Sequence, residues 1–159
     1  TLKAARLLKD LLRRSAGVDP VWKNAWRNEY FWFSGQAYKQ WSFGRTLVKN
    51  GFSSGYYSMG VGAVILSKQA FASGRPRKGE AWAMQAISAW RSYLDQKKNY
   101  YNAYVWFAQA LGLAGHSTKM EKALRKAAKL SGRPLNYIEF TNARKDVANA
   151  LALVVKARF

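Results

Sequence analysis

One stretch of the chain decides how the rest is interpreted: residues 51–74, GFSSGYYSMGVGAVILSKQAFASG. It overlaps a run from Asn50 to Ser67 of 18 consecutive residues without a charge. As a helix this run covers roughly 27 Å, close to the hydrocarbon thickness of a bilayer. The run predicts a transmembrane helix over residues 51–74, and the alternative is a buried helix of an all-helical domain.

Small residues recur at every fourth position of this stretch and predict the face on which the helix packs. Gly51 and Gly55 are four apart, and so are Ser54, Ser58 and Gly62. In membranes such a ridge lets a neighbouring helix approach closely, because lipid gives no hydrophobic drive for helix pairing. We therefore expect Gly51, Gly55, Ser58 and Gly62 to pack against other membrane protein. Basic residues flank the stretch at both ends and are expected to contact anionic lipid: Arg45, Lys49, Lys68, Arg75, Arg77 and Lys78.

The composition narrows the class of protein. A length of 159 residues favours one domain, and a formal charge of +19 predicts an anionic environment such as nucleic acid, anionic lipid or acidic protein. The absence of cysteine excludes disulfides and thiolate catalysis, and a single histidine, His116, argues against a histidine metal site. The eight acidic residues form no paired motif, so each is expected to be a helix cap or a salt-bridge partner. We expect no catalytic residue, no metal and no cofactor.

Residues 1–50 are expected to form an amphipathic and aromatic N-terminal segment. Leucines at positions 7, 8, 11 and 12 share one face of a predicted basic helix. We expect this face to lie on an anionic membrane surface, on a partner protein or on the rest of the fold. Asp19-Pro20 marks a turn. Residues 18–41 then interleave aromatic and basic side chains, a pattern typical of an interfacial belt and also of a surface that stacks bases. Its position just before residue 51 favours the belt.

Residues 75–159 are expected to form a helical, hairpin-type extension. Apolar spacing predicts helices over 80–95, 99–114, 118–130 and from about 136 to 156, with no strands. Thr118 and Glu121 have the spacing of a capping box. Residues 110–132 resemble a tetratricopeptide helix pair, but Gly74 and Gly115 lie 41 apart, not the about 34 of that repeat. A helical hairpin is therefore expected, not a repeat array.

Residues 17–64 as a unit resemble a known family. The pieces occur in this order: Asp19-Pro20, a Trp-, Asn- and Arg-rich run over 22–27, Gly35, Ala37, Ser42-Phe43, Lys49, Gly51-Phe52, Gly55 and Val61-Gly62-Ala63. This order is similar to that of the NADH dehydrogenase beta-subcomplex subunit 3 family, small single-span accessory subunits of mitochondrial complex I. The chain departs from the family by an inserted Asn50, by Val21 between Pro20 and Trp22, and by everything beyond Gly74.

The resemblance implies an all-α protein with one transmembrane helix in the mitochondrial inner membrane. It implies a non-catalytic accessory subunit that supports assembly and stability of the complex I membrane arm. Its partners would be other membrane-arm subunits and cardiolipin, with no nucleic acid. The alternative hypothesis, drawn from the charge and the aromatic content, is a soluble, basic, all-helical RNA- or ribosome-associated protein.

Overall fold

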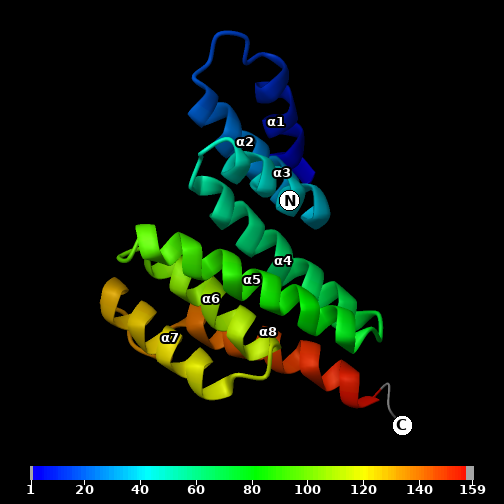
Figure 1. Ribbon diagram of the computed structural model, residues 1–159, viewed down its shortest axis with the longest axis vertical. Helices are drawn as coiled ribbons and strands as arrows, with labels where there is room; N and C mark the ends of the chain where they lie inside the picture. Colours follow the sequence, from blue (N-terminus) through cyan, green and yellow to red (C-terminus); the bar gives the residue numbers. More distant parts are fainter. Residues whose placement is uncertain (1, 157–159) are drawn as a thin grey trace.

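The computed structural model describes residues 2–156, with side chains described as far as Leu153. Within this range the chain forms eight helices and no strand, so the all-helical part of the predicted fold class agrees with the structure (Figure 1). The helices, joined by short turns, are α1 (Leu2–Arg13), α2 (Pro20–Phe33), α3 (Ala37–Lys49), α4 (Ser54–Ala72), α5 (Pro76–Gln96), α6 (Tyr101–Leu113), α7 (Ser117–Ser131) and α8 (Ile138–Lys156).

Most helices pack on the helix that follows them in the chain. The closest neighbours are α1 with α2, α3 with α4, α4 with α5, α5 with α6, and α6 with α7. The helix α8 is the exception, because it returns to contact α6 and α4. In Figure 1 the helices α1–α3 occupy one end of an elongated molecule, α4 and α5 cross its middle, and α6–α8 form the other end.

Glycine in the left-handed region ends several of these helices. After α6, Gly115 has φ +80° and the amide of His116 donates to the carbonyl of Leu111 at 2.8 Å. This bond belongs to the Schellman motif, which satisfies carbonyls that have no partner inside the helix. After α3, Gly51 has φ +83° and the amide of Phe52 donates to Leu47 in the same way. Short turns of this kind make the flanking helices antiparallel neighbours.

The predicted transmembrane helix over residues 51–74 is wrong. Among the described residues, no helix combines the length and the apolar character that crossing a bilayer requires. The stretch forms α4, which contacts α3, α5, α6 and α8, and more than half of its residues are buried. Its buried Ser67 hydroxyl donates to the Gly79 carbonyl of α5 at 2.7 Å, so the polar group is satisfied inside the protein. The predicted location as a single-pass protein of the mitochondrial inner membrane is wrong for the same reason.

The small residues of α4 bring helices of this same chain together. A Cβ on Gly62 would lie 2.8 Å from the Ala37 carbonyl oxygen of α3, and a Cβ on Gly55 would meet the Gly44 carbonyl oxygen. On another side of α4, Gly60 lies against the Trp90 ring, which is fully buried. Ser58 is buried as well. Close packing by these residues therefore occurs, and its partners are α3 and α5.

Asp19 begins α2 and is one of the acidic residues with a structural role. Its side chain accepts a hydrogen bond from the Val21 amide at 2.7 Å, and Pro20 occupies the first helical position, where a missing N–H costs nothing. The predicted capping box of Thr118 and Glu121 is absent, because α7 begins at Ser117 without a side-chain cap. Glu121 pairs with Arg144 of α8 instead.

Candidate functional site

A basic groove with an aromatic floor lies where α5, α6 and α7 meet. It has a volume of about 320 Å³. Its floor comes from α6, where Tyr104, Phe107 and Leu111 lie at positions i, i+3 and i+7 and so share one helix face. The two rings and Leu111 lie beside the buried core that α6 shares with its neighbours. The groove therefore has a firm apolar base.

Lysines of α7 form one wall of this groove. Lys119, Lys122 and Lys126 repeat the i, i+3, i+7 spacing, and Arg91 of α5 contributes a fourth cation. All four side chains are exposed to solvent. No carboxylate lines the groove among the described residues. The arrangement places a row of positive charge beside two aromatic side chains.

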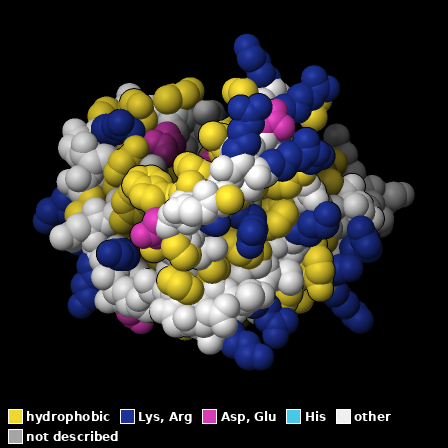
Figure 2. All heavy atoms as spheres, turned by 90° about the horizontal axis from the view of Figure 1, so that it is seen from above, with side chains coloured by type: hydrophobic (Ala, Val, Ile, Leu, Met, Phe, Trp, Pro, Cys, Tyr) yellow, Lys and Arg dark blue, Asp and Glu magenta, His cyan; other side chains and the backbone are white. Residues whose placement is uncertain are grey.

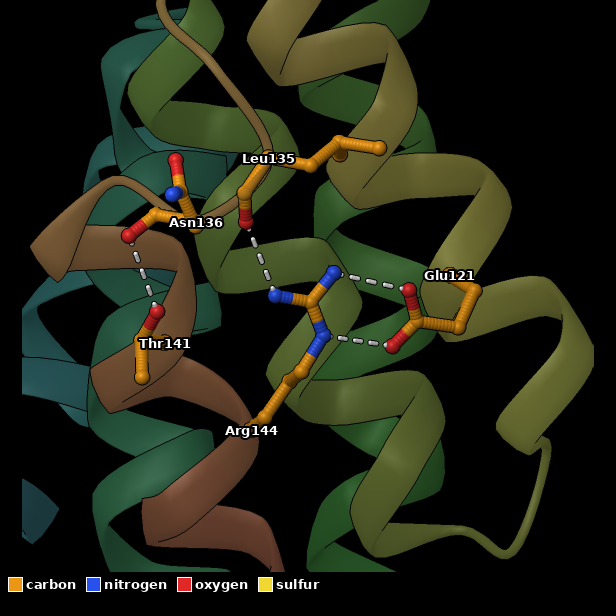
Figure 3. A network of polar contacts seen from close by, with 5 residues as sticks. All are labelled: Glu121, Leu135, Asn136, Thr141 and Arg144. Carbon is orange, nitrogen blue, oxygen red and sulfur yellow. Dashed lines mark hydrogen bonds and ion pairs between the residues drawn. The ribbon is translucent and has the colours of Figure 1, made fainter.

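The opposite face of α7 is fixed to α8 by a bidentate ion pair. Arg144 donates from Nε and Nη2 to the two carboxylate oxygens of Glu121 at 2.7 and 2.8 Å, and from Nη1 to the Leu135 carbonyl at 3.1 Å (Figure 3). The hydrogen bonds from Arg144 lower the pKa of the Glu121 carboxyl. Because Arg144 neutralises the one acidic residue of α7, that carboxylate does not cancel the lysine row.

A second groove, of about 480 Å³, lies between α3 and α4 and contains two of the predicted lipid-contacting residues, Arg45 and Lys49. Tyr56 and Met59 also line it. The Arg45 guanidinium lies 5.0 Å from the Trp41 ring centroid, in cation–π distance. This groove thus carries fewer cations than the α5–α7 groove, and one of them already has a partner in the protein.

The remaining predicted site residues are not brought together. Lys68 of α4 is partly buried, and its ammonium donates to Gln109 of α6 at 2.5 Å and to Asp146 of α8 at 2.8 Å. All three basic side chains near the turn from α4 to α5 are exposed: Arg75, Arg77 and Lys78. Gly51 lies in the turn before α4, with nothing near the position of a Cβ, so it has no packing role.

The far end of the molecule exposes apolar side chains among basic ones. Figure 2 looks along the long axis onto the α1–α3 end, and Lys and Arg project around its rim while hydrophobic side chains lie open between them. Val21 and Trp22 of α2 are among the exposed residues, as are Leu7 and Leu11 of α1. The aromatic stretch of residues 18–41 thus forms α2 and the start of α3, and only part of it is buried.

Comparisons with known protein families, with characterised proteins and with solved structures gave no match. The resemblance to the complex I accessory subunits therefore stays a prediction. The described residues also contain no group of three or more metal-ligating side chains. His116 is exposed at the turn between α6 and α7.

Proposed function

We propose that this protein binds single-stranded nucleic acid in the α5–α7 groove, in line with the second of the two sequence hypotheses. The observation that carries the proposal is the row of Lys119, Lys122 and Lys126 beside the rings of Tyr104 and Phe107. Proteins that bind single strands combine a positively charged groove, which follows the phosphates, with aromatic rings on which bases stack. Each stacked base contributes about 1–3 kcal/mol.

The spacing of the lysines suits a polyanion. Residues three and four apart on a helix are neighbours, so the α7 ammonium groups form a line along the helix axis. An extended strand presents one phosphate per nucleotide and meets such a line with successive charges. The remaining basic residues raise the positive field over the whole surface, which speeds association with a polyanion.

The accessory-subunit hypothesis has lost its main physical support. It required a helix that inserts between membrane subunits, and the helix in question is the centre of this chain's own bundle. The remaining support for that hypothesis is the order of short sequence motifs between residues 17 and 64. No feature of the described fold favours that function over nucleic-acid binding.

The direct test is fluorescence anisotropy with a labelled oligonucleotide of about 12 nucleotides, within the range that single binding modules cover. The first variant is Lys122→Gln/Lys126→Gln, which removes two wall charges. Its matched control is Lys97→Gln/Lys98→Gln, which removes two exposed charges at the turn between α5 and α6. We expect the first pair to weaken binding several times more than the second. Equal losses would show that only net charge matters and would overturn the assignment to this groove.

A second variant tests the aromatic floor separately. Phe107→Leu keeps an apolar side chain in the half-buried position but removes the ring on which a base stacks. From the energy of one stacked base we expect binding to weaken by roughly fivefold or more. Circular dichroism and thermal melting check that the helices remain. Unchanged affinity of a folded Phe107→Leu protein would remove stacking from the proposal.

A further inference from the structure

A separate cavity of about 300 Å³ lies between α2, the start of α4 and the turn from α5 to α6. Its walls differ from the rest of this basic protein. They include three tyrosines, Tyr57, Tyr93 and Tyr100, and the carboxyl group of Glu29, together with the side chains of Asn24 and Asn28. Although the chain has 27 Lys and Arg residues, none of them lines this cavity among the described residues.

The three tyrosine rings form a corner and not a stack. Their centroids are 5.4 Å apart for Tyr57 and Tyr93, 6.2 Å for Tyr57 and Tyr100, and 6.3 Å for Tyr93 and Tyr100. The ring planes are inclined to one another by 64°, 48° and 62°. The buried Trp90 supports them from behind, with its centroid 5.2 Å from Tyr57 and 5.9 Å from Tyr93. Three mutually inclined rings therefore border the same cavity.

Glu29 differs from the other acidic residues. Four acidic residues lie in ion pairs, Asp10, Glu121, Glu139 and Asp146, and Asp19 caps α2. Two more, Glu80 and Asp95, have no ion pair among the described residues but are exposed to solvent. Glu29 is half-buried, and among the described residues no Lys or Arg lies within ion-pair distance of it. Burial raises the pKa of its carboxyl group. A carboxylate in such a position costs stability unless a cation joins it.

We propose that this cavity binds a methylated ammonium group, held by the faces of Tyr57, Tyr93 and Tyr100 and neutralised by Glu29. Aromatic faces attract cations through the ring quadrupole, and quaternary ammonium groups are recognised by several rings at once. A bare ammonium is strongly hydrated and requires hydrogen-bond acceptors, whereas methyl groups make apolar contact with rings. The cavity volume lies at the lower end of the range for small-ligand pockets.

The cavity is accessible from solvent. Val21 and Tyr100 at its edge are 61% and 42% exposed, so a ligand enters without unfolding of a helix. Asn28 accepts a hydrogen bond from the buried Gln40 at 3.0 Å, which fixes its amide and leaves its own N–H groups for a polar part of the ligand. The same ammonium chemistry occurs in small molecules such as choline and in a trimethylated lysine side chain. The two sources are separated by experiment.

The test is calorimetric titration of the full chain with choline, with its uncharged isostere 3,3-dimethylbutanol, and with a peptide that carries trimethyl-lysine beside its unmodified form. We expect choline or the methylated peptide to bind and the isostere not to bind. Preference for the methylated peptide would identify a protein ligand, and preference for choline a small molecule. Equal binding of choline and its isostere, or binding of neither cation source, would overturn the proposal.

Variants locate the binding in this cavity. Tyr100→Leu removes one ring and is expected to weaken binding by about fivefold, in keeping with one exposed cation–π contact. Glu29→Gln removes the charge and is expected to weaken it further. The controls are Tyr38→Leu, an exposed tyrosine of α3, and Glu80→Gln, an exposed glutamate of α5, which should leave binding unchanged. Equal effects of the cavity variants and the controls would place the ligand elsewhere. Glu29→Gln should also leave nucleic-acid binding unchanged, since it lies outside the α5–α7 groove.

Discussion

The contact between α3 and α4 offers a direct test of the packing that replaces the predicted membrane span. Gly44 and Gly55 face each other, so that each backbone approaches the other without a side chain between them. In Gly55→Ala the new methyl group would meet the Gly44 carbonyl oxygen and would lie 2.8 Å from Leu47 Cβ and from Val48 Cγ2. Because one obstacle is backbone, the helices must separate to admit the methyl group.

Two opposing terms set the size of the effect. Replacing glycine by alanine inside a helix gains about 1 kcal/mol in helix propensity. Overpacking a close contact costs about 1–3 kcal/mol, and a backbone obstacle places this case at the upper end. The expected result is a net loss of about 1–2 kcal/mol in the free energy of unfolding. For a chain of this size that corresponds to a fall in Tm of roughly 2–8 °C.

The assay is thermal and urea unfolding followed by circular dichroism at 222 nm. Ser88→Ala is the matched control, since Ser88 is exposed on α5 and also gains helix propensity. The control should change stability by less than about 0.5 kcal/mol. If Gly55→Ala were as stable as the wild type or more stable, the close approach of α3 and α4 would be refuted.

Three further predictions concern charge. If the four cations of the α5–α7 groove contact phosphates, a plot of log K for nucleic-acid binding against log salt concentration should have a slope of about −3 in anisotropy titrations. Lys122→Gln should make this slope shallower by about 0.7. A slope near zero would contradict the site. Glu29 lines the same cavity as Tyr57, Tyr93 and Tyr100, and burial raises the pKa of its carboxyl group in the folded protein. The neutral carboxyl group therefore favours folding. This contribution to the free energy of unfolding is complete below the pKa of the unfolded chain and is lost as pH rises through the pKa of the folded protein. Glu29→Gln should therefore have a higher Tm than the wild type at pH 7 and an equal Tm at about pH 4. The hydrogen bonds from Arg144 lower the pKa of Glu121 in the folded protein. The ionised carboxylate therefore favours folding, and this contribution to the free energy of unfolding is present above the pKa of the unfolded chain and is lost as pH falls through the pKa of the folded protein. A double-mutant cycle of Glu121 and Arg144 should give a coupling energy of up to about 1 kcal/mol at pH 7 and none in strong acid.

The sequence was sufficient for most of the helices, but it did not predict α2 and α3, and it misassigned the surroundings of α4. Apolar spacing with Gly and Pro at the boundaries predicted the helices of residues 75–156 to within a few residues. The stretch over residues 51–74 was misassigned because glycine and serine permit close helix approach both in lipid and in a protein bundle. The contact that distinguishes a protein bundle from lipid is the ion pair of Lys68 with Asp146, which lies 78 positions away along the chain. A single sequence carries no signal for such a distant pair.

The α5–α7 groove was missed for a related reason. The basic and aromatic pattern was sought within one continuous stretch, residues 18–41, whereas the groove takes its rings from α6 and its lysines from α7. A signal was present: Tyr104, Phe107 and Leu111 share one face, Lys119, Lys122 and Lys126 share another, and the two helices were expected to form a hairpin. The Tyr57, Tyr93 and Tyr100 corner had no such signal, because its members come from three separate segments.

The order in which the helices contact one another also bears on how the chain folds. Pairing of each helix with its successor means that most native contacts join residues close in sequence, which corresponds to a low contact order. Helical proteins of this kind fold in microseconds to milliseconds, faster than proteins built on distant strand pairs. Contacts between distant segments are fewer, and they include the docking of α8, whose Val147 covers Gly112 of α6. During synthesis the hairpins through α7 can therefore form before α8 has been made, and the described bundle closes when α8 docks.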